Sequence, residues 1–191
     1  MPRGLAHDHE AKRAALRKGA AAYFAEHGYD RASMAGAAAA CGVSKALVYH
    51  YYDGKEDLLF DILDTHLSDL LTVAEAVGDG PDGLRNLIRA LLSAYRDADD
   101  EHKLQTDALD RLPSEARKIL LGTQHRLIEI MEATLVAITP DLPQEKRRPL
   151  TMSVFGMLNW YYMWQRPGRG MSRSAYGDFV ADLVLGGIRA V

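Results

Sequence analysis

Hydrogen-bonding side chains crowd one short stretch of this sequence. Lys45, Tyr49, His50 and Tyr51 bring an ammonium group, an imidazole and two phenols together within seven residues. Such groups donate hydrogen bonds to phosphate oxygens and to base edges. Aromatic and imidazole side chains are costly to leave bare on a helix unless a partner covers them. The residue types therefore indicate a binding surface for nucleic acid.

The stretch from residue 33 to residue 55 contains the elements that would position these side chains. Ser33 and Ser44 are each suited to cap a short helix, because a serine hydroxyl accepts an unpaired backbone N–H of the first turn. Val48 and Tyr52 are four residues apart and share the inner face of the second helix. Two short helices joined by a tight turn suit the major groove of DNA. The alternative is a helical hairpin inside an all-α core, with the tyrosine rings packed.

The segment GVSKALVYHYYDGKEDLL resembles the signature of the TetR family of transcriptional regulators. In that family a Gly-Val-Ser turn precedes a recognition helix that ends in aromatic residues. The resemblance covers about residues 16 to 59 and implies a three-helix DNA-binding head with a helix-turn-helix. We place this head at residues 1–54 and a helical ligand-binding and dimerisation domain at residues 55–191.

The resemblance also implies a role for each side chain near the DNA. The residues expected to contact phosphate groups are Tyr49, Tyr51, Lys55, Ser33 and Ser44. The residues expected to read base edges are Lys45, Leu47 and His50. Ala46 stands where the family commonly has glycine at a close approach to DNA, and its methyl group could contact a thymine methyl. Leu47 is apolar, so it can read only shape or a thymine methyl.

Composition and charge bound the fold class and the compartment. No alternating Val, Ile and Thr runs bounded by turns occur, so we expect an all-α fold of about nine helices. Residues 1–55 hold eight Lys/Arg and five Asp/Glu, whereas residues 56–191 hold fifteen and twenty-one, a balance that fits a basic head contacting phosphate. The single cysteine and the lack of a signal peptide or membrane-spanning run predict a cytoplasmic protein.

Apolar periodicity predicts helices along the whole chain. The predicted helices lie at about residues 9–27, 33–41, 44–52, 55–77, 82–98, 113–138, 150–164 and 174–190. Loops are expected at the acidic residues 97–101 and the Pro-rich residues 139–149. Four cations of the first helix should face outward, for solubility or for contact with the DNA backbone: Lys12, Arg13, Arg17 and Lys18.

The last two predicted helices differ from the others. Residues 150–164 are apolar around nearly the whole helix, so several sides must be covered. Two copies of this helix and of residues 174–190 can cover one another as a four-helix bundle, which is how TetR-family dimers form. A symmetric homodimer would place two recognition helices about 34 Å apart, on successive major grooves of a palindromic operator in double-stranded DNA.

Five of the seven methionines and both tryptophans fall between residues 131 and 171. Met and Trp suit an adaptable apolar ligand cavity, although core and dimer packing would give the same pattern. The residues expected to line a cavity are Met131, Met152, Phe155, Asn159, Trp160, Met163, Trp164 and Arg166. The segment FGMLNWYYMWQRPGRG also resembles TetR-like regulators that sense acyl-coenzyme A thioesters, which implies a ligand with a greasy tail and an anionic head. A drug-efflux regulator that senses a hydrophobic compound is the alternative.

Motifs for catalysis and for cofactors are missing from the sequence. No phosphate loop, zinc spacing or nucleophile motif occurs, nor the Glu-x-x-His pair of a di-iron bundle. His7 and His9 form a lone His-x-His without a framed set of metal ligands. A structural dimerisation module would leave the basic aromatic stretch unexplained. We therefore expect no enzyme, metal or cofactor. The resemblance to the TetR family implies a repressor that a small effector releases from DNA, with activation as the alternative.

Overall fold

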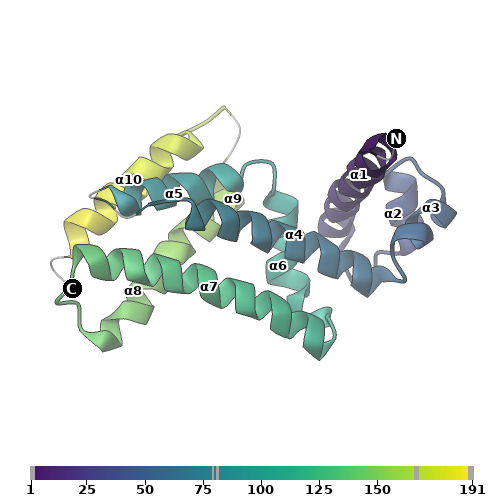
Figure 1. Ribbon diagram of the computed structural model, residues 1–191. Coiled ribbons are helices and arrows are strands. Elements are labelled where there is room, and N and C mark those ends of the chain that lie inside the picture. The colour runs from purple at the N-terminus through teal and green to yellow at the C-terminus, as the bar shows by residue number, and fades with distance from the viewer. Residues whose placement is uncertain (1–2, 79, 81, 166–167, 189–191) are drawn as a thin grey trace. The chain divides into compact units, whose positions relative to one another are not determined.

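The computed structural model describes residues 3–78, 80, 82–165 and 168–188, with side chains from residue 9 onward (Figure 1). Helices α1 to α10, of which α9 is a single turn, and the 3-10 turn η1 account for most of these residues, which confirms the prediction of an all-α fold. None of the described helices is both long enough and apolar enough to cross a bilayer. Contacts divide the chain into a head unit, Met1–His66 with Asp100–Leu120, and a body unit, Leu67–Asp99 with Leu121–Val191.

The head unit is built from short helices around the N-terminal helix. Its elements are α1 (Arg3–His27), α2 (Met34–Ala40), α3 (Lys45–Tyr51), the first half of α4 (Lys55–Glu75), α6 (Asp99–Ala108) and η1 (Leu109–Arg111). Gly28 ends α1 with a φ of +79°, a conformation that glycine adopts at little cost. Small residues let α2 lie close to α1, since a Cβ on Gly36 would collide with the phenol of Tyr23.

The acidic residues before α6 are not the loop that the sequence predicted. Only Asp97, with a φ of +63°, and Ala98 remain outside a helix, because α6 begins at Asp99. Carboxylates in a first turn are stabilised by the positive end of the helix dipole, and Glu101 also pairs with Lys18 of α1 at 2.9 Å. Because α6 packs with α1, the contact units depart from the predicted division at residues 54 and 55.

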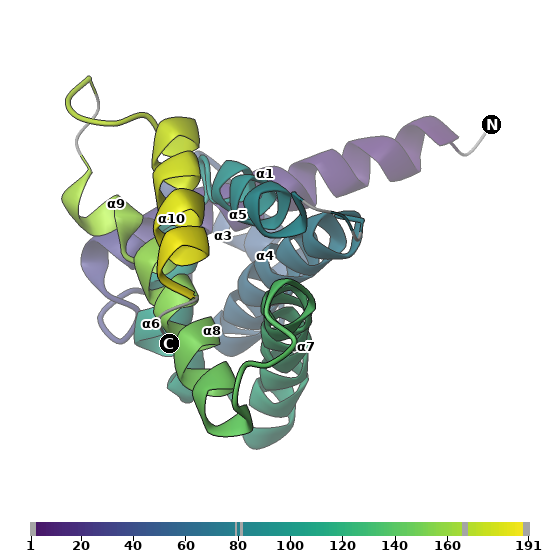
Figure 2. The same cartoon turned by 90° about the vertical axis from the view of Figure 1, so that its left-hand side faces the viewer.

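The body unit contains the second half of α4 and the helices that follow it. These are α5 (Gly83–Ala94), most of α7 (Ser114–Ile138), α8 (Gln144–Asn159), α9 (Tyr161–Trp164) and α10 (Arg173–Gly187). α5 and α10 run side by side (Figure 1 and Figure 2). Gly177 permits this approach, since a Cβ there would lie 3.1 Å from Cδ1 of Leu92. Arg89 of α5 fixes the pair by an ion pair with Asp178 at 2.7 Å.

Two predictions for the C-terminal third were wrong. α8 begins at Gln144, so residues 144–149 are helical and Pro149 lies inside the helix. Proline disfavours a helical residue before it, which is why the sequence placed the start later, but here the helix gives up one backbone bond. The helix predicted at residues 150–164 is interrupted at Trp160, which separates α8 from α9.

Candidate nucleic-acid interface

Two serine caps fix the helix-turn-helix of the head unit. The hydroxyl of Ser33 accepts a hydrogen bond from the backbone N–H of Gly36 at 3.1 Å, and that of Ser44 accepts one from Leu47 at 3.1 Å. Both caps were predicted from the sequence and are confirmed. Gly42, with a φ of +67°, turns the chain between α2 and α3. Each hydroxyl accepts a hydrogen bond in its cap and still has its own proton, which it could donate to a phosphate oxygen.

Helix α3 packs inward through a single residue of its own and presents the rest to solvent. Val48 is fully buried, and Tyr52 directly after the helix is 2% exposed. The exposed residues of α3 are Lys45, Ala46, Tyr49 and His50, while Leu47 and Tyr51 are half-buried. The ammonium of Lys45 lies 5.4 Å from the ring centroid of Tyr49, a cation–π contact on the outer face. The alternative of tyrosines packed inside the core therefore holds only for Tyr52.

His9 of α1 joins the aromatic end of α3. Its ring lies 4.6 Å from the ring of Tyr51 and 6.2 Å from that of His50, centroid to centroid. The phenol of Tyr51 also donates to the backbone oxygen of His9 at 3.5 Å. The sequence analysis considered His9 only as part of a lone His-x-His without a framed set of metal ligands, whereas the structure places it beside the predicted DNA-contacting residues.

Lys55 is engaged within the head unit, a role beyond the predicted phosphate contact. Its Nζ donates to the backbone oxygens of Tyr29 at 2.9 Å and Ala32 at 3.0 Å, and it lies 4.4 Å from the ring centroid of Tyr29. These carbonyls follow the end of α1, where no helical N–H is available to them. These bonds engage at least two of the three N–H donors of the ammonium group, so we expect Lys55 to act mainly within the head unit, and the phosphate contact stays a prediction. Lys55 connects the start of α4 to the turn between α1 and α2.

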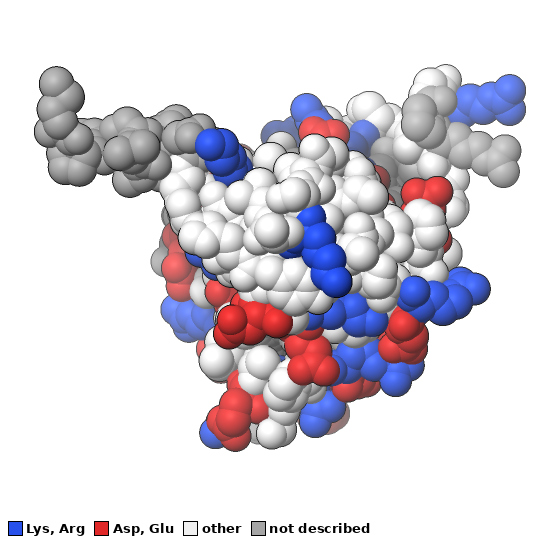
Figure 3. All heavy atoms as spheres, turned by 90° about the vertical axis from the view of Figure 1, so that its right-hand side faces the viewer, with Lys and Arg blue, Asp and Glu red and all other residues white. Residues whose placement is uncertain are grey.

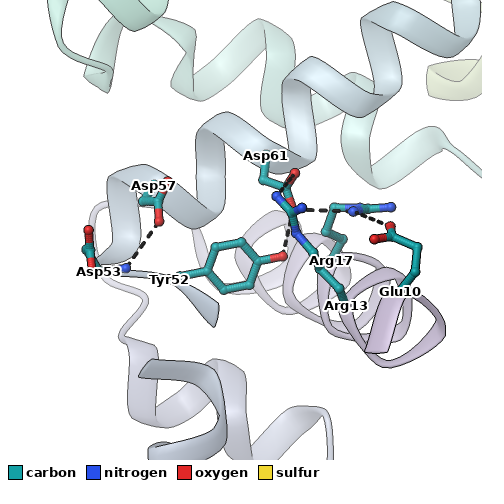
Figure 4. Close-up of polar contacts among 7 residues, drawn as sticks. All are labelled: Glu10, Arg13, Arg17, Tyr52, Asp53, Asp57 and Asp61. Atoms are coloured by element: carbon teal, nitrogen blue, oxygen red, sulfur yellow. Dashed lines mark hydrogen bonds and ion pairs between the residues drawn. The ribbon is translucent and has the colours of Figure 1, made fainter. Parts of the chain in front are cut away.

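A second polar group fixes α1 and α3 to α4 (Figure 4). The carboxylate of Asp61 accepts a hydrogen bond from Tyr52 at 2.6 Å and ion pairs from Arg13 at 2.7 Å and Arg17 at 3.4 Å. Burial, followed by the Asp61 hydrogen bond, raises the pKa of Tyr52, so the phenol stays protonated and donates. The Tyr52 hydrogen bond, followed by the charge of Asp61, also raises the pKa of Arg13.

Of the four α1 cations predicted to face outward, Lys12 and Lys18 are exposed, whereas Arg13 and Arg17 are half-buried. Arg13 and Arg17 are held by Asp61, and Lys18 is held by Glu101. Figure 3 shows the outcome on one face, where uncharged side chains predominate and Lys and Arg are interspersed with Asp and Glu. The surface of α3 is therefore marked by side chains that end in hydrogen-bonding groups, and not by a continuous patch of positive charge.

None of the described residues that were predicted to line a ligand cavity belongs to the linings of the cavities reported below. Met131 and Phe155 are buried in the core, and Asn159 accepts a hydrogen bond from the phenol of Tyr95 at 2.9 Å. Four others are largely exposed, namely Met152, Trp160, Met163 and Trp164. Arg166 lies outside the described residues. Met and Trp serve a covered interface as well as they serve a cavity, so composition alone does not separate the two roles.

The exposed members belong to an apolar surface on the last three helices. Its largest exposed side chains are Met152, Trp160, Met163, Trp164, Phe179 and Leu183, from α8, α9 and α10. Side chains of this size at about half exposure are unusual on a monomer surface unless a partner covers them. We call this set the tail surface.

The largest cavity described in the body unit lies elsewhere. It has a volume of about 560 Å³ and is formed by the end of α4, the start of α5 and the second half of α7. Its apolar and small lining residues include Ala74, Leu87, Ile130, Ala133 and Ala137. The charged lining residues include Arg126, which forms two ion pairs. Its Nε lies 3.6 Å from Oε1 of Glu75, and its Nη1 lies 3.5 Å from Oε2 of Glu129. The sequence analysis missed this cavity because small residues, rather than large ones, create the space.

A helix-turn-helix with an uncovered second helix, joined to a helical body with a cavity of ligand size, defines a ligand-responsive DNA-binding regulator. Comparisons with known proteins agree. Residues 16–62 match the family model for bacterial regulatory proteins of the tetR family, and residues 78–188 match that for the tetracyclin repressor-like C-terminal domain. The chain belongs to the TetR family, whose members regulate transcription and are not enzymes.

Solved structures extend the likeness over nearly the whole chain. A TetR-family transcriptional regulator from Bordetella parapertussis 12822 is 32% identical, with 94% of this chain and 96% of that one covered and a TM-score of 0.86. PfmR from Thermus thermophilus is 26% identical, with 91% and 98% covered and a TM-score of 0.79. AibR, solved with isovaleryl coenzyme A and operator DNA, shares the fold at 22% identity, 90% and 96% coverage and a TM-score of 0.77. No curated protein sequence matches the chain significantly.

Proposed function

We propose that this regulator is a homodimeric repressor that binds a palindromic operator through its two α3 helices. The observation that carries the proposal is the outer face of α3. Lys45, Tyr49 and His50 are exposed there on a helix that is capped by Ser44 and anchored by Val48. A rigid short helix with donor groups at its tips is the geometry that the major groove accepts.

The roles of the individual residues follow from their reach. Tyr49 and Tyr51 would hold phosphate groups, with Ser33 and Ser44 at the helix starts, while Lys55 would act mainly by fixing the head. The base-reading set would be Lys45, Ala46, Leu47 and His50. The predicted division between residues 54 and 55 would then separate the helices that read the operator from the helices that bind the effector and the second subunit. The head unit defined by contacts is larger, because it also contains residues 55–66 and 100–120.

Dimerisation would use the tail surface. Its aromatic and aliphatic side chains come from α8, α9 and α10, and two copies related by a two-fold axis would bury the same side chains on both subunits. One recognition helix reads few base pairs. Two such helices, one helical turn of DNA apart, would read both halves of an operator with the same symmetry.

The effector would bind in the 560 Å³ cavity rather than among the methionines and tryptophans. This volume lies in the range of small-molecule sites, and its lining combines apolar residues with Arg126. An acyl-CoA, with its acyl chain along Ile130 and Leu87 and an anionic group near Arg126, is the first candidate. The AibR structure holds such a ligand on the same fold.

A cationic apolar compound is the second candidate, as for a regulator of drug efflux. Glu75 and Glu129 both line the cavity and both pair with the single Arg126. A positively charged ligand could replace Arg126 beside these carboxylates. In either case the effector must favour the non-binding arrangement of the dimer, by a coupling of about 1–3 kcal/mol. Helix α4 is continuous from Asp61 in the head unit to Glu75 at the cavity, so it would carry the change.

A gel shift with the DNA upstream of the chain's own gene tests the proposal. Repressor binding should weaken steeply as salt rises, and random duplex should compete poorly. Calorimetry with a panel of acyl-CoAs, free acids and cationic apolar compounds would then identify the effector class. Heat from the CoA thioesters alone, with release of DNA, supports the first candidate. Heat from the cations alone supports the second, and absence of any operator binding would reject the repressor.

A further inference from the structure

A second cavity of the body unit lies between α5 and the start of α10. Its volume is about 210 Å³, and its lining residues are Arg89, Leu92, Ser93, Arg96, Arg173 and Ser174. Three guanidinium groups and two hydroxyls make this wall a set of hydrogen-bond donors. We propose that this cavity is a binding site for a phosphate-bearing anion, separate from the effector cavity.

Residues of α5 and of the turn after it build one wall of this site. Arg89, Leu92 and Ser93 are spaced by three and one residues, which places them on one face of α5, and Arg96 lies in the turn that follows the helix. The close packing of α10 at Gly177 brings the opposite wall near, because Leu92 touches α10 there. Arg173 and Ser174 stand one turn before that contact, at the start of α10.

The arginines keep donors to spare after their ion pairs. Arg173 contacts Asp99 through Nη2 alone, at 3.1 and 3.3 Å. Arg89 contacts Asp178 through Nε and Nη2. A guanidinium group has five N–H donors, so each of these side chains can also bind an anion. Arg96 is exposed and has no carboxylate partner among the described residues.

The charges and the helix direction favour a multiply charged oxyanion. Three guanidinium groups face two carboxylates, those of Asp99 and Asp178, which leaves positive charge at the cavity. The start of the fifteen-residue helix α10 adds the positive end of its dipole. Arginine binds phosphate through two parallel hydrogen bonds. The two carboxylates nearby cannot form such paired bonds with all three arginines at once. The volume is several times the roughly 30 Å³ of a water molecule and suits one or two phosphate groups.

The site is independent of the effector cavity. Leu87 lines the effector cavity and Arg89 lines this one, and two residues of an α-helix are separated by about 200° around its axis. The two cavities therefore open on different sides of α5. A phosphate-bearing metabolite held here would bridge α5 to α10, the helix that also carries Phe179 and Leu183 of the tail surface.

Calorimetry of the full-length protein, without DNA or effector, tests this site directly. The titrants are orthophosphate, pyrophosphate and adenosine 3′,5′-bisphosphate, each against sodium chloride of matched ionic strength. We expect saturable binding of pyrophosphate or the bisphosphate at one site per chain. Arg96→Gln should raise the dissociation constant at least about tenfold, because it removes a charged donor. Arg148→Gln, a matched change at an exposed arginine of α8 that lies outside the cavity, should leave it unchanged.

The comparison of the three titrants identifies the source of the phosphate. Tighter binding of the bisphosphate indicates a nucleotide-like ligand, and equal binding of pyrophosphate indicates the phosphate groups alone. No heat beyond the salt control, or equal affinity in Arg96→Gln and the parent, overturns the proposal. Thermal unfolding checks that the variant is folded. If Arg96→Gln is unstable, Arg96→Lys replaces it, since it keeps the charge but loses the paired donors and should still bind more weakly.

Discussion

The phenol of Tyr52 lies 2.6 Å from the carboxylate of Asp61, so the residue after the recognition helix is bonded directly to α4. The same carboxylate holds Arg13 and Arg17 of α1. Asp61 thus fixes α1 and the residue that follows α3 to α4, a helix that continues into the body unit. Any displacement of α4 at Asp61 must strain these bonds or move α1 and the end of α3 with it.

Tyr52→Phe tests the importance of this bond. The variant loses the donor to Asp61, and we expect a loss of about 1–2 kcal/mol in the free energy of unfolding. Urea unfolding monitored by circular dichroism measures it. Tyr49→Phe removes an equivalent hydroxyl from an exposed side chain and should change stability by less than about 0.5 kcal/mol. Equal effects of the two changes would contradict the structural role of the bond.

Substitutions on α3 should separate into two classes. Tyr49→Ala should weaken binding to specific and random duplex by similar factors, because a phosphate contact carries no sequence information. Lys45→Ala and His50→Ala should reduce the ratio of specific to random affinity, because each loses a contact to a base edge worth about 1–3 kcal/mol. Gel shifts on both duplexes at several salt concentrations give the two quantities. A uniform loss across all three variants would reject the division.

Lys55→Met should reduce stability rather than act only on DNA. The change keeps an unbranched chain over Tyr29 but removes the charged donor to the backbone oxygens of Tyr29 and Ala32, and the Tyr29 oxygen then keeps only the N–H of Ala32 at 3.2 Å. We expect a loss of about 1–3 kcal/mol in the free energy of unfolding of the protein without DNA. The original idea of a phosphate contact makes the opposite prediction, namely unchanged stability with weaker binding to every duplex.

Acidification should destabilise the head unit through His66. Burial, and to a smaller extent the neighbouring His102 and Lys18, lowers the pKa of His66 to about 3. In the unfolded chain an ordinary histidine takes up its proton near pH 6.5, so protons favour the unfolded state between pH 6.5 and 3. The stabilisation by neutral His66 is complete above pH 6.5 and is lost below it, by about 1 kcal/mol between pH 7 and 5.5. Urea unfolding at both pH values should show this loss in the parent, and a clearly smaller one in His66→Leu.

Charges placed on the tail surface should dissociate the dimer. Phe179 and Leu183 are 50% and 52% exposed on α10, and a buried glutamate at either position would lack a partner. Phe179→Glu should give a folded monomer with much weaker operator binding, as judged by light scattering after gel filtration. Ile119→Glu, at an equally exposed apolar residue of α7, serves as the control and should remain dimeric. A dimeric Phe179→Glu protein would place the interface elsewhere.

Local patterns were sufficient to predict the helix-turn-helix. The serine caps, the glycine after α1 and the pair Val48 and Tyr52 are all effects within a few residues, so spacing alone locates them. The acidic residues 97–101 and the start of α8 were predicted wrongly because their structure does not depend on local pattern alone. Their helices depend on a tertiary partner, such as Lys18 for Glu101, or on tolerance of one proline.

The roles of charged and large apolar side chains were not determined locally. Lys55 and Arg13 carry the same charge whether they face a phosphate, a carbonyl or a carboxylate, and only the folded chain brings Tyr29 and Asp61 beside them. Trp160 and Met163 are equally apolar in a cavity and on an interface.

The sequence by itself determined the fold class, the family and the exposed face of the second helix of the helix-turn-helix, because capping, helical period and turn chemistry act over a few residues. The tertiary structure decided which cations are engaged and where the cavities lie, because both depend on side chains that are distant in the chain. A cavity is made by small residues meeting across helices, and no local pattern records that meeting.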